Sequence, residues 1–259
     1  LKEEGGYRVV TDIPGKGTVE SPAFRIGAEV YEGTADFLLT YMRQQRCGDN
    51  PFLDTLCHQN DGYIVLHPER TGEKIDVRGG WHDATDYLQY LTTSANATFQ
   101  MMFAYTQAED KSVFKDRFDA TGRPGVNGIP DILDEVRWGL EWLLKMNPED
   151  KMMFNQIADD RDHVGFRLPV GDKADYGWGP GGGRPVYFIT GERQGLREHI
   201  NRTTGVASSA GKFASAFALG AELFRELDPG FAEKMKAKAL PAYHFAEEKP
   251  GNLYAMCGN

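Results

Sequence analysis

The chain has 259 residues, a formal net charge of -9 at pH 7, and a composition of 41% hydrophobic and 26% charged residues. This length allows one or two domains, and the acidic balance argues against nucleic acid as a partner and suits a neutral ligand such as a polysaccharide. The sequence contains no run of about 18 apolar residues, so we expect no membrane span.

The first 22 residues have the composition of an extended segment. Gly-Gly and Pro-Gly pairs flank a short apolar run at 7–10. We expect a leader or the last strand of a preceding module here, and a separate domain over residues 23–259. Because the chain begins at Leu1 and shows no signal peptide, we expect a processed or excised piece.

The rest of the chain alternates helical patterns with long loops. Apolar residues recur three or four apart in five segments, and we expect helices over 24–46, 87–107, 128–147 and 205–227 and from Asp228 onward. Pro241 should kink or end the last helix. No strand-rich block competes, so we predict an all-α fold. Residues 149–204 are irregular, and a loop region this long could form one wall of a cleft.

Two cysteines and two histidines form a candidate metal site. Cys47, Cys57 and His58 lie in one loop after the first expected helix, and His82 lies beside two carboxylates. Two thiolates and two imidazoles are a common tetrahedral zinc set, and four protein ligands would make the zinc structural. The alternative is a Cys47–Cys57 disulfide with two unrelated histidines. We favour zinc because it accounts for both histidines, and we expect Cys257 to stay unpaired.

The two carboxylates stand three residues apart in segment 79–87, which reads Gly-Gly-Trp-His-Asp-Ala-Thr-Asp-Tyr. The glycine pair permits backbone conformations that other residues resist, and residues at i and i+3 point the same way if a helix begins there. Asp83 and Asp86 could then hold one water molecule together. The alternative is a plain helix start with Asp83 as the N-cap and Asp86 in the first turn. The spacing alone does not choose between these interpretations.

Two long segments resemble the motifs of a known family. Residues 76–87 read Asp-Val-Arg-Gly-Gly-Trp-His-Asp-Ala-Thr-Asp-Tyr, and residues 128–146 read Gly-Ile-Pro-Asp-Ile-Leu-Asp-Glu-Val-Arg-Trp-Gly-Leu-Glu-Trp-Leu-Leu-Lys-Met. Both are similar to motifs of glycoside hydrolase family 9, the inverting cellulases and related β-glucanases, and they occur in the family's order. A looser likeness covers 201–214, so the resemblance runs from Ser21 to the end. Thr85 departs from it, because the family usually has glycine there.

The resemblance implies an (α/α)6 barrel, a toroid of six helical hairpins, which would be incomplete here and carry long loops. It also implies hydrolysis of β-1,4 bonds in cellulose, mixed-linkage glucan or a related glucan with inversion, with Asp86 as the general base and Asp83 helping to hold the water. The general acid must stay protonated. We expect it in a missing C-terminal part, because Glu135 and Glu141 have the pattern of helix-end or packing residues.

The same resemblance implies partners and a location. The partner is a β-glucan polysaccharide or oligosaccharide, and a complementary C-terminal polypeptide could complete the barrel. Relatives often carry an immunoglobulin-like domain before the catalytic one, so residues 1–22 could be its remnant. Some bacterial relatives also hold a structural zinc close to the position of the Cys/His group. The expected location is secreted, periplasmic or cell-surface. The competing interpretation is a non-catalytic carbohydrate-binding helical protein or an inactive fragment.

Several aromatic residues are candidates for contacts with sugar. Trp81, Tyr90 and Trp178 could stack on sugar rings, because an aromatic face can lie against the C–H groups of a pyranose. Trp138 and Trp142 lie on an expected helix with the spacing of core residues, so we expect them to pack in the interior.

Polar residues in the long loop region have two interpretations. His163 and Arg167 could reach a cleft, although nothing in the sequence orients them. The carboxylates of Asp159, Asp160 and Asp162 could bind calcium, as acidic loops do in parts of this family. The alternative for these three residues is a solvated loop.

Overall fold

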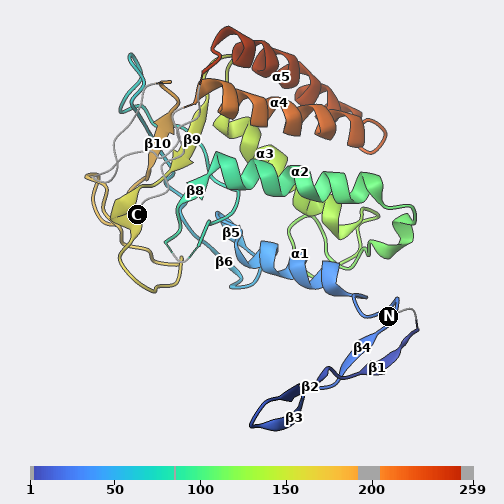
Figure 1. The fold of residues 1–259 in the computed structure, drawn as a ribbon. Coiled ribbons are helices and arrows are strands. Elements are labelled where there is room, and N and C mark those ends of the chain that lie inside the picture. The colour runs from blue at the N-terminus through green and yellow to red at the C-terminus, as the bar shows by residue number, and fades with distance from the viewer. Residues whose placement is uncertain (1–2, 85, 192–204, 252–259) are drawn as a thin grey trace. The chain divides into compact units, whose positions relative to one another are not determined.

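The chain divides into two compact units, residues 1–38 and 39–259. The computed structural model describes residues 3–84, 86–191 and 205–251 (Figure 1). In the first unit, β1 (Gly5–Tyr7) pairs with β4 (Phe24–Ile26), and β2 (Val10–Ile13) pairs with β3 (Gly17–Glu20), both antiparallel. Every residue of β2 and β3 is exposed, so these two strands bury no side chain of their own.

The described residues contain five α-helices, which are α1 (Thr34–Gln44), α2 (Leu91–Gln107), α3 (Asp131–Met146), α4 (Val206–Leu223) and α5 (Pro229–Glu248). The five predicted helices are therefore confirmed, but each begins later than expected, and the largest differences are at α1 and α2. Helix α1 starts late because residues 24–26 are strand, and α2 starts late because Gln89 and Tyr90 form β8. Helix α5 continues through Pro241, so that proline does not end it. None of the described helices is long and apolar enough to cross a membrane.

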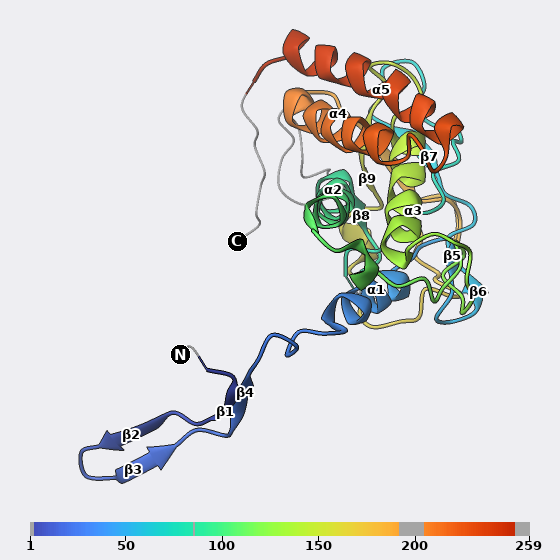
Figure 2. The same cartoon turned by 90° about the vertical axis from the view of Figure 1, so that its right-hand side faces the viewer.

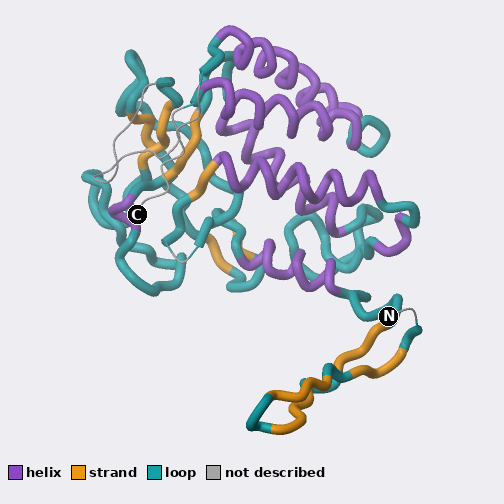
Figure 3. Tube along the Cα trace, in the orientation of Figure 1, coloured by secondary structure: helices purple, strands orange, loops and turns teal. Residues whose placement is uncertain are grey.

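A small sheet lies beside the helices of the second unit (Figure 3). Its strand order is β7 (Tyr63–Val65), β10 (Pro185–Phe188), β9 (Phe154–Ile157) and β8 (Gln89–Tyr90), and only the β7–β10 pair is parallel. The all-α prediction is wrong in this respect. Strands β9 and β10 lie in the stretch expected to be loop. Both are almost fully buried, so neither shows the alternation of apolar and polar residues that marks a half-buried strand. A further hairpin, β5 (Asp49–Asn50) with β6 (Thr55–Leu56), follows α1.

The main core lies where α2, α3, α4 and α5 meet the sheet, and α4 packs along α5 (Figure 2). Two glycines allow close approach there. A Cβ on Gly220 would lie 2.8 Å from the Leu140 side chain. A Cβ on Gly139 would lie 2.3 Å from Thr98 Oγ1 and 2.4 Å from the Trp81 ring. Gly139 therefore sets how closely α3 approaches both α2 and the segment that precedes the two carboxylates.

Gly139→Ala should lower the free energy of unfolding by about 1–3 kcal/mol, because the new methyl group has no room between Thr98 and Trp81. Gly211→Ala in α4 is the matched control, because a Cβ there meets nothing within 4 Å. It should leave stability unchanged or raise it by up to about 1 kcal/mol. Urea unfolding measures both effects, and equal losses in the two variants would contradict the packing argument.

Candidate active site and metal centre

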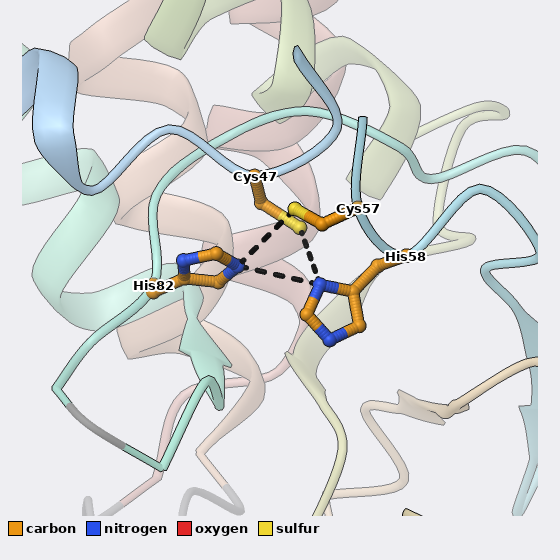
Figure 4. Close-up of side chains that lie close together, drawn as sticks. All are labelled: Cys47, Cys57, His58 and His82. Carbon is orange, nitrogen blue, oxygen red and sulfur yellow. Dashed lines mark hydrogen bonds between the residues drawn. The ribbon is translucent and has the colours of Figure 1, made fainter. Parts of the chain in front are cut away.

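Four predicted metal ligands, Cys47, Cys57, His58 and His82, point toward one another (Figure 4), and one ligand atom of each lies within 4.8 Å of all the others. The separations are 3.5 Å from Cys47 Sγ to His58 Nδ1, 3.9 Å from Cys57 Sγ to His82 Nε2, and 3.4 Å between the two nitrogens. Zinc bonds of about 2.0–2.3 Å in a tetrahedron place ligand atoms roughly 3.3–3.8 Å apart, so the set fits such a site. Neither cysteine forms a disulfide, and Cys257 lies outside the described residues.

Backbone hydrogen bonds join the two chain segments that carry these ligands. The Cys47 N–H donates to the Gly80 carbonyl at 2.9 Å, and the His82 N–H donates to the Gln45 carbonyl at 2.8 Å. Gly80 has a φ of 70°, and a Cβ there would lie 2.7 Å from the Trp142 ring. Glycine is therefore required at this position both for its backbone conformation and for the close approach to α3.

Burial and hydrogen bonds determine the protonation of the Cys/His group. Burial lowers the pKa of His82 to about 4, so its ring is neutral at pH 7 and keeps a lone pair for a metal. Burial raises the pKa of the Cys47 thiol, whereas the hydrogen bond with that thiol lowers the pKa of Cys57. Arg184 Nη2 lies 3.4 Å from Cys47 Sγ, and the Gly48 N–H donates to Cys57 Sγ at 3.3 Å. Both contacts act against the effect of burial and favour the thiolate, which is the form that binds a metal.

The loop after His82 carries both predicted catalytic carboxylates. Asp83 is exposed, and its Oδ1 accepts a hydrogen bond from Thr93 Oγ1 at 3.0 Å. The side chain of Asp86 is 21% exposed, and its Oδ2 lies 2.9 Å from His163 Nε2. Its buried Oδ1 has no hydrogen-bond partner in the described part of the chain. The structure thus supplies the orientation of His163 that the sequence did not.

The loop with the two carboxylates is not a helix start. Helix α2 begins at Leu91 with Tyr90 as its N-cap, so the interpretation of Asp83 as an N-cap is wrong. The reason lies in Tyr87, whose φ of 57° is uncommon for a large side chain and interrupts helical geometry before β8. Thr85 lies outside the described residues.

Asp83 lines a groove with a volume of about 710 Å³. Tyr41 and Phe52 also line it, and they are 52% and 55% exposed. Exposed aromatic rings beside a carboxylate could support a sugar ring. The sequence analysis did not identify this pair, because Tyr41 lies within the apolar periodicity of the expected helix over 24–46 and Phe52 lies in the loop that follows it.

Trp81 is a structural residue and is not open to a ligand. Its side chain is 4% exposed, and its Nε1 donates to Glu135 Oε1 at 2.7 Å. The prediction of Trp81 as a sugar platform is therefore wrong, because its ring fills the space beside Gly139. Glu135 is fully buried, with Oε2 2.8 Å from Arg46 Nη2, in agreement with the expected packing role.

The other aromatic candidates differ in exposure. Trp178 stacks on Tyr63 with ring centroids 4.5 Å apart and stays 38% exposed. Tyr90 is partly buried. Their contacts with sugar stay predictions. Trp142 is 1% exposed, and Trp138 donates a hydrogen bond to a backbone carbonyl at 2.8 Å, as expected for packing residues.

The acidic cluster of Asp159, Asp160 and Asp162 is largely buried, and calcium binding there stays a prediction. Asp159 and Asp162 are completely buried and form ion pairs with Arg161 and Arg167. The solvated-loop interpretation is therefore wrong for these two. Within the described ranges, the Cys/His group is the one set of at least three His, Cys, Asp or Glu side chains whose ligand atoms lie close enough together to hold a metal ion.

Comparison with known proteins places these features in context. The family model described as Glycosyl hydrolase family 9 matches residues 31–258. Endoglucanase D of Acetivibrio thermocellus is 28% identical, over 98% of this chain and 37% of that protein. A cellodextrinase of Butyrivibrio fibrisolvens is 26% identical, over 98% of this chain and 41% of that protein. The chain thus spans less than half the length of these relatives.

Solved structures give the same relationship. A metagenome-derived glycoside hydrolase family 9 endoglucanase is 32% identical with a TM-score of 0.66, covering 97% of this chain and 41% of that chain. A Zn-binding triple mutant of the family 9 endoglucanase J30 is 27% identical with a TM-score of 0.69, covering 100% of this chain and 45% of that chain.

Glu135→Gln should lower the free energy of unfolding by about 3–5 kcal/mol, because it leaves the buried Arg46 charge without its partner. Glu141→Gln in the same helix is the control. Its pair with Arg137 is partly exposed, so the loss should stay below about 1 kcal/mol. Denaturant unfolding of both variants measures the difference. A loss for Glu135→Gln as small as that of the control would mean that this contact does not hold the site together.

Proposed function

Because the chain belongs to glycosyl hydrolase family 9, we propose that it carries the base side of an inverting β-1,4-glucanase. In this proposal Asp86 is the general base and Asp83 helps to hold the attacking water. The substrate would be cellulose, mixed-linkage glucan or a related β-glucan. The supporting observation is that one loop carries both carboxylates, with Asp83 at a groove of about 710 Å³ and Asp86 held by His163.

In this proposal the two carboxylates act together to activate water. A general base must be oriented and must lie within reach of the proton that it takes. His163 can donate from Nε2 to one oxygen of Asp86, which leaves Oδ1 for another hydrogen bond. A water molecule between the carboxylates could donate one proton to each. Its oxygen would then attack the anomeric carbon while Asp86 takes the proton.

Inversion also needs a general acid roughly 6.5–9.5 Å from the base, and we expect that acid outside the 259 residues. Glu135 is unsuitable, because it is fully buried and bound to Arg46 and Trp81. Glu141 pairs with Arg137 on the partly exposed face of α3. Because neither of these two glutamates fits the role of the acid, the alternative function is a carbohydrate-binding protein that keeps the groove without hydrolysis.

We also propose that Cys47, Cys57, His58 and His82 hold a structural zinc ion. Their spacing and burial fit zinc, and one solved relative is a Zn-binding triple mutant of a family 9 endoglucanase. Zinc would act only as a cross-link, because four protein ligands leave no position for water. The cross-link would join the segment after α1 to the loop that begins with Asp83.

We propose that a second groove is covered by the rest of an (α/α)6 barrel, which would belong to the same or to a complementary polypeptide. This groove has a volume of about 810 Å³ and lies over α4 and α5, where small side chains such as Ala214 and Ala218 line it. The chain covers only 41% and 45% of the two solved relatives described above. We place the protein outside the cytoplasm, secreted, periplasmic or on the cell surface, because its proposed substrate is a polysaccharide.

The 259-residue chain should bind cellohexaose but release no reducing sugar, because in this proposal it supplies the base while the acid lies elsewhere. Isothermal titration and a reducing-sugar assay measure these two properties. Turnover that disappears in Asp86→Asn would show that the acid lies within this chain. A complete lack of binding would contradict the glucanase proposal.

The base itself is tested in a form extended by the C-terminal part of the family domain. There Asp86→Asn should lower kcat by about 10²–10⁴-fold, while oligosaccharide affinity changes by less than about threefold. Asp54→Asn, whose side chain is 86% exposed, is the control and should keep its activity. If the extended form binds oligosaccharides but does not hydrolyse them, the carbohydrate-binding alternative is favoured.

Elemental analysis of the purified chain should find one zinc ion, and Cys47→Ser should abolish it. When free zinc is at a thousandfold excess over its Kd, the bound metal should add about 4 kcal/mol to the free energy of unfolding, and a chelator should remove that contribution. Cys257→Ser is the control and should retain the metal. A zinc-free protein with Cys47 and Cys57 oxidised to a disulfide would remove the metal proposal.

A further inference from the structure

We propose that Asp172 is a positioning residue that couples the metal centre to Asp86, through Arg167 and the segment that carries His163. The inference rests on the zinc site proposed above. It extends that proposal by assigning the residues through which a structural metal acts on the loop that would hold the attacking water.

Asp172 contacts the nitrogen of His58 that faces away from the other metal ligands. His58 Nδ1 lies 3.4 Å from His82 Nε2 on the metal side, whereas His58 Nε2 lies 3.2 Å from Asp172 Oδ2. The side chains of His58 and Asp172 are 6% and 5% exposed. A carboxylate on the second ring nitrogen fixes the tautomer and raises ligand basicity, and loss of such a partner typically lowers metal affinity about 10–100-fold.

Arg167 binds the other side of the same carboxylate. Its Nε lies 2.8 Å from Asp172 Oδ1, and its Nη2 lies 3.2 Å from Oδ2, so two N–H groups hold one carboxylate. The guanidinium also pairs with the buried carboxylate of Asp162, and its Nη1 donates to the Asp162 carbonyl at 3.1 Å. Arg167 therefore connects Asp172 to the short 3-10 helix Asp160–Asp162.

That short helix leads directly to the partner of Asp86. His163 follows Asp162, and its Nε2 lies 2.9 Å from Asp86 Oδ2. The Arg167 guanidinium lies over the ring of Tyr87, 4.7 Å from its centroid, and the Tyr87 hydroxyl donates to the Arg167 carbonyl. His163, which contacts Asp86, and Tyr87, which follows Asp86 in the chain, are thus both held in place through Arg167 and the residues beside it.

Tyr87 also contacts the metal ligands directly. Its ring centroid lies 4.7 Å from that of His82 and 5.8 Å from that of His58. A residue with a φ of 57° keeps that conformation only where its surroundings hold it. A metal that immobilises both imidazoles would immobilise the surface against which Tyr87 packs. Metal binding and the Asp86–His163 contact are therefore coupled, and such coupling is reciprocal in free energy.

The test compares the wild-type chain with Asp172→Asn and Asp175→Asn, each with and without zinc. Asp175 is the matched control, because its carboxylate accepts from the backbone of Gly177 and Gly179. Competition with a chromophoric chelator measures zinc affinity, and hydrogen–deuterium exchange measures the protection of segment 159–173. Zinc should slow exchange there in the wild type and in Asp175→Asn. In Asp172→Asn, zinc affinity should fall about 10–100-fold, and saturating zinc should no longer slow exchange.

Arg167→Lys separates the two steps and serves if Asp172→Asn fails to fold. It keeps Asp172 on His58 but loses the two-point contact. We therefore expect zinc affinity within about threefold of the wild type, with the zinc-dependent protection of 159–173 lost.

Each unfavourable outcome has a distinct meaning. If Asp172→Asn speeds exchange equally with and without zinc, Asp172 is merely structural and the inference is overturned. Wild-type zinc affinity in Asp172→Asn, or zinc-dependent protection retained in Arg167→Lys, overturns it as well. If the wild-type chain binds no zinc, the proposed metal site fails first and the inference fails with it. Loss of the glucanase activity alone would leave the coupling intact.

Discussion

The buried carboxylate of Glu135 is the contact on which the rest of the site depends. It accepts from Arg46 and from Trp81, and these two residues directly precede Cys47 and His82. A buried ion pair adds little net stability, because desolvation of both charges offsets their attraction. Its contribution here is geometric. A shift of α3 against either segment would leave a charge buried without a partner, so two proposed metal ligands from distant segments are held in place.

From that contact outward, the site passes from buried to exposed. Glu135 is fully buried, His82 is 4% exposed, and Asp83 is exposed at the groove. A group that activates water must reach solvent, so it belongs on a loop, and loops have few packing contacts to keep them in place. A buried Cys/His group one residue before Asp83 offers the order that the exposed loop lacks. Under the proposed function, this arrangement would give a structural metal a role in a reaction in which it takes no direct part.

The small sheet also helps to position the loop that carries Asp83 and Asp86. Strand β8 follows the two carboxylates and pairs with β9, which leads into the segment of Asp162 and His163. The ladder therefore brings together two stretches that are far apart in the chain, one with Asp86 and one with the imidazole bonded to it. Arg167 and Asp172 complete this connection by linking the second stretch to His58.

Local patterns in the sequence were sufficient for the helices, the motif with the two carboxylates and the four candidate metal ligands. Helical periodicity is repeated over many residues, and Cys and His are few enough to be recognised by type alone. Strands β9 and β10 were not predicted, because both are short and almost fully buried and so show no alternation of apolar and polar residues. The burial of Trp81, the exposure of Tyr41 and the contact of His163 with Asp86 were decided only by the tertiary structure. Each depends on a partner contributed by a distant segment, such as Glu135 for Trp81, and burial is a property of those partners rather than of neighbouring residues in the chain.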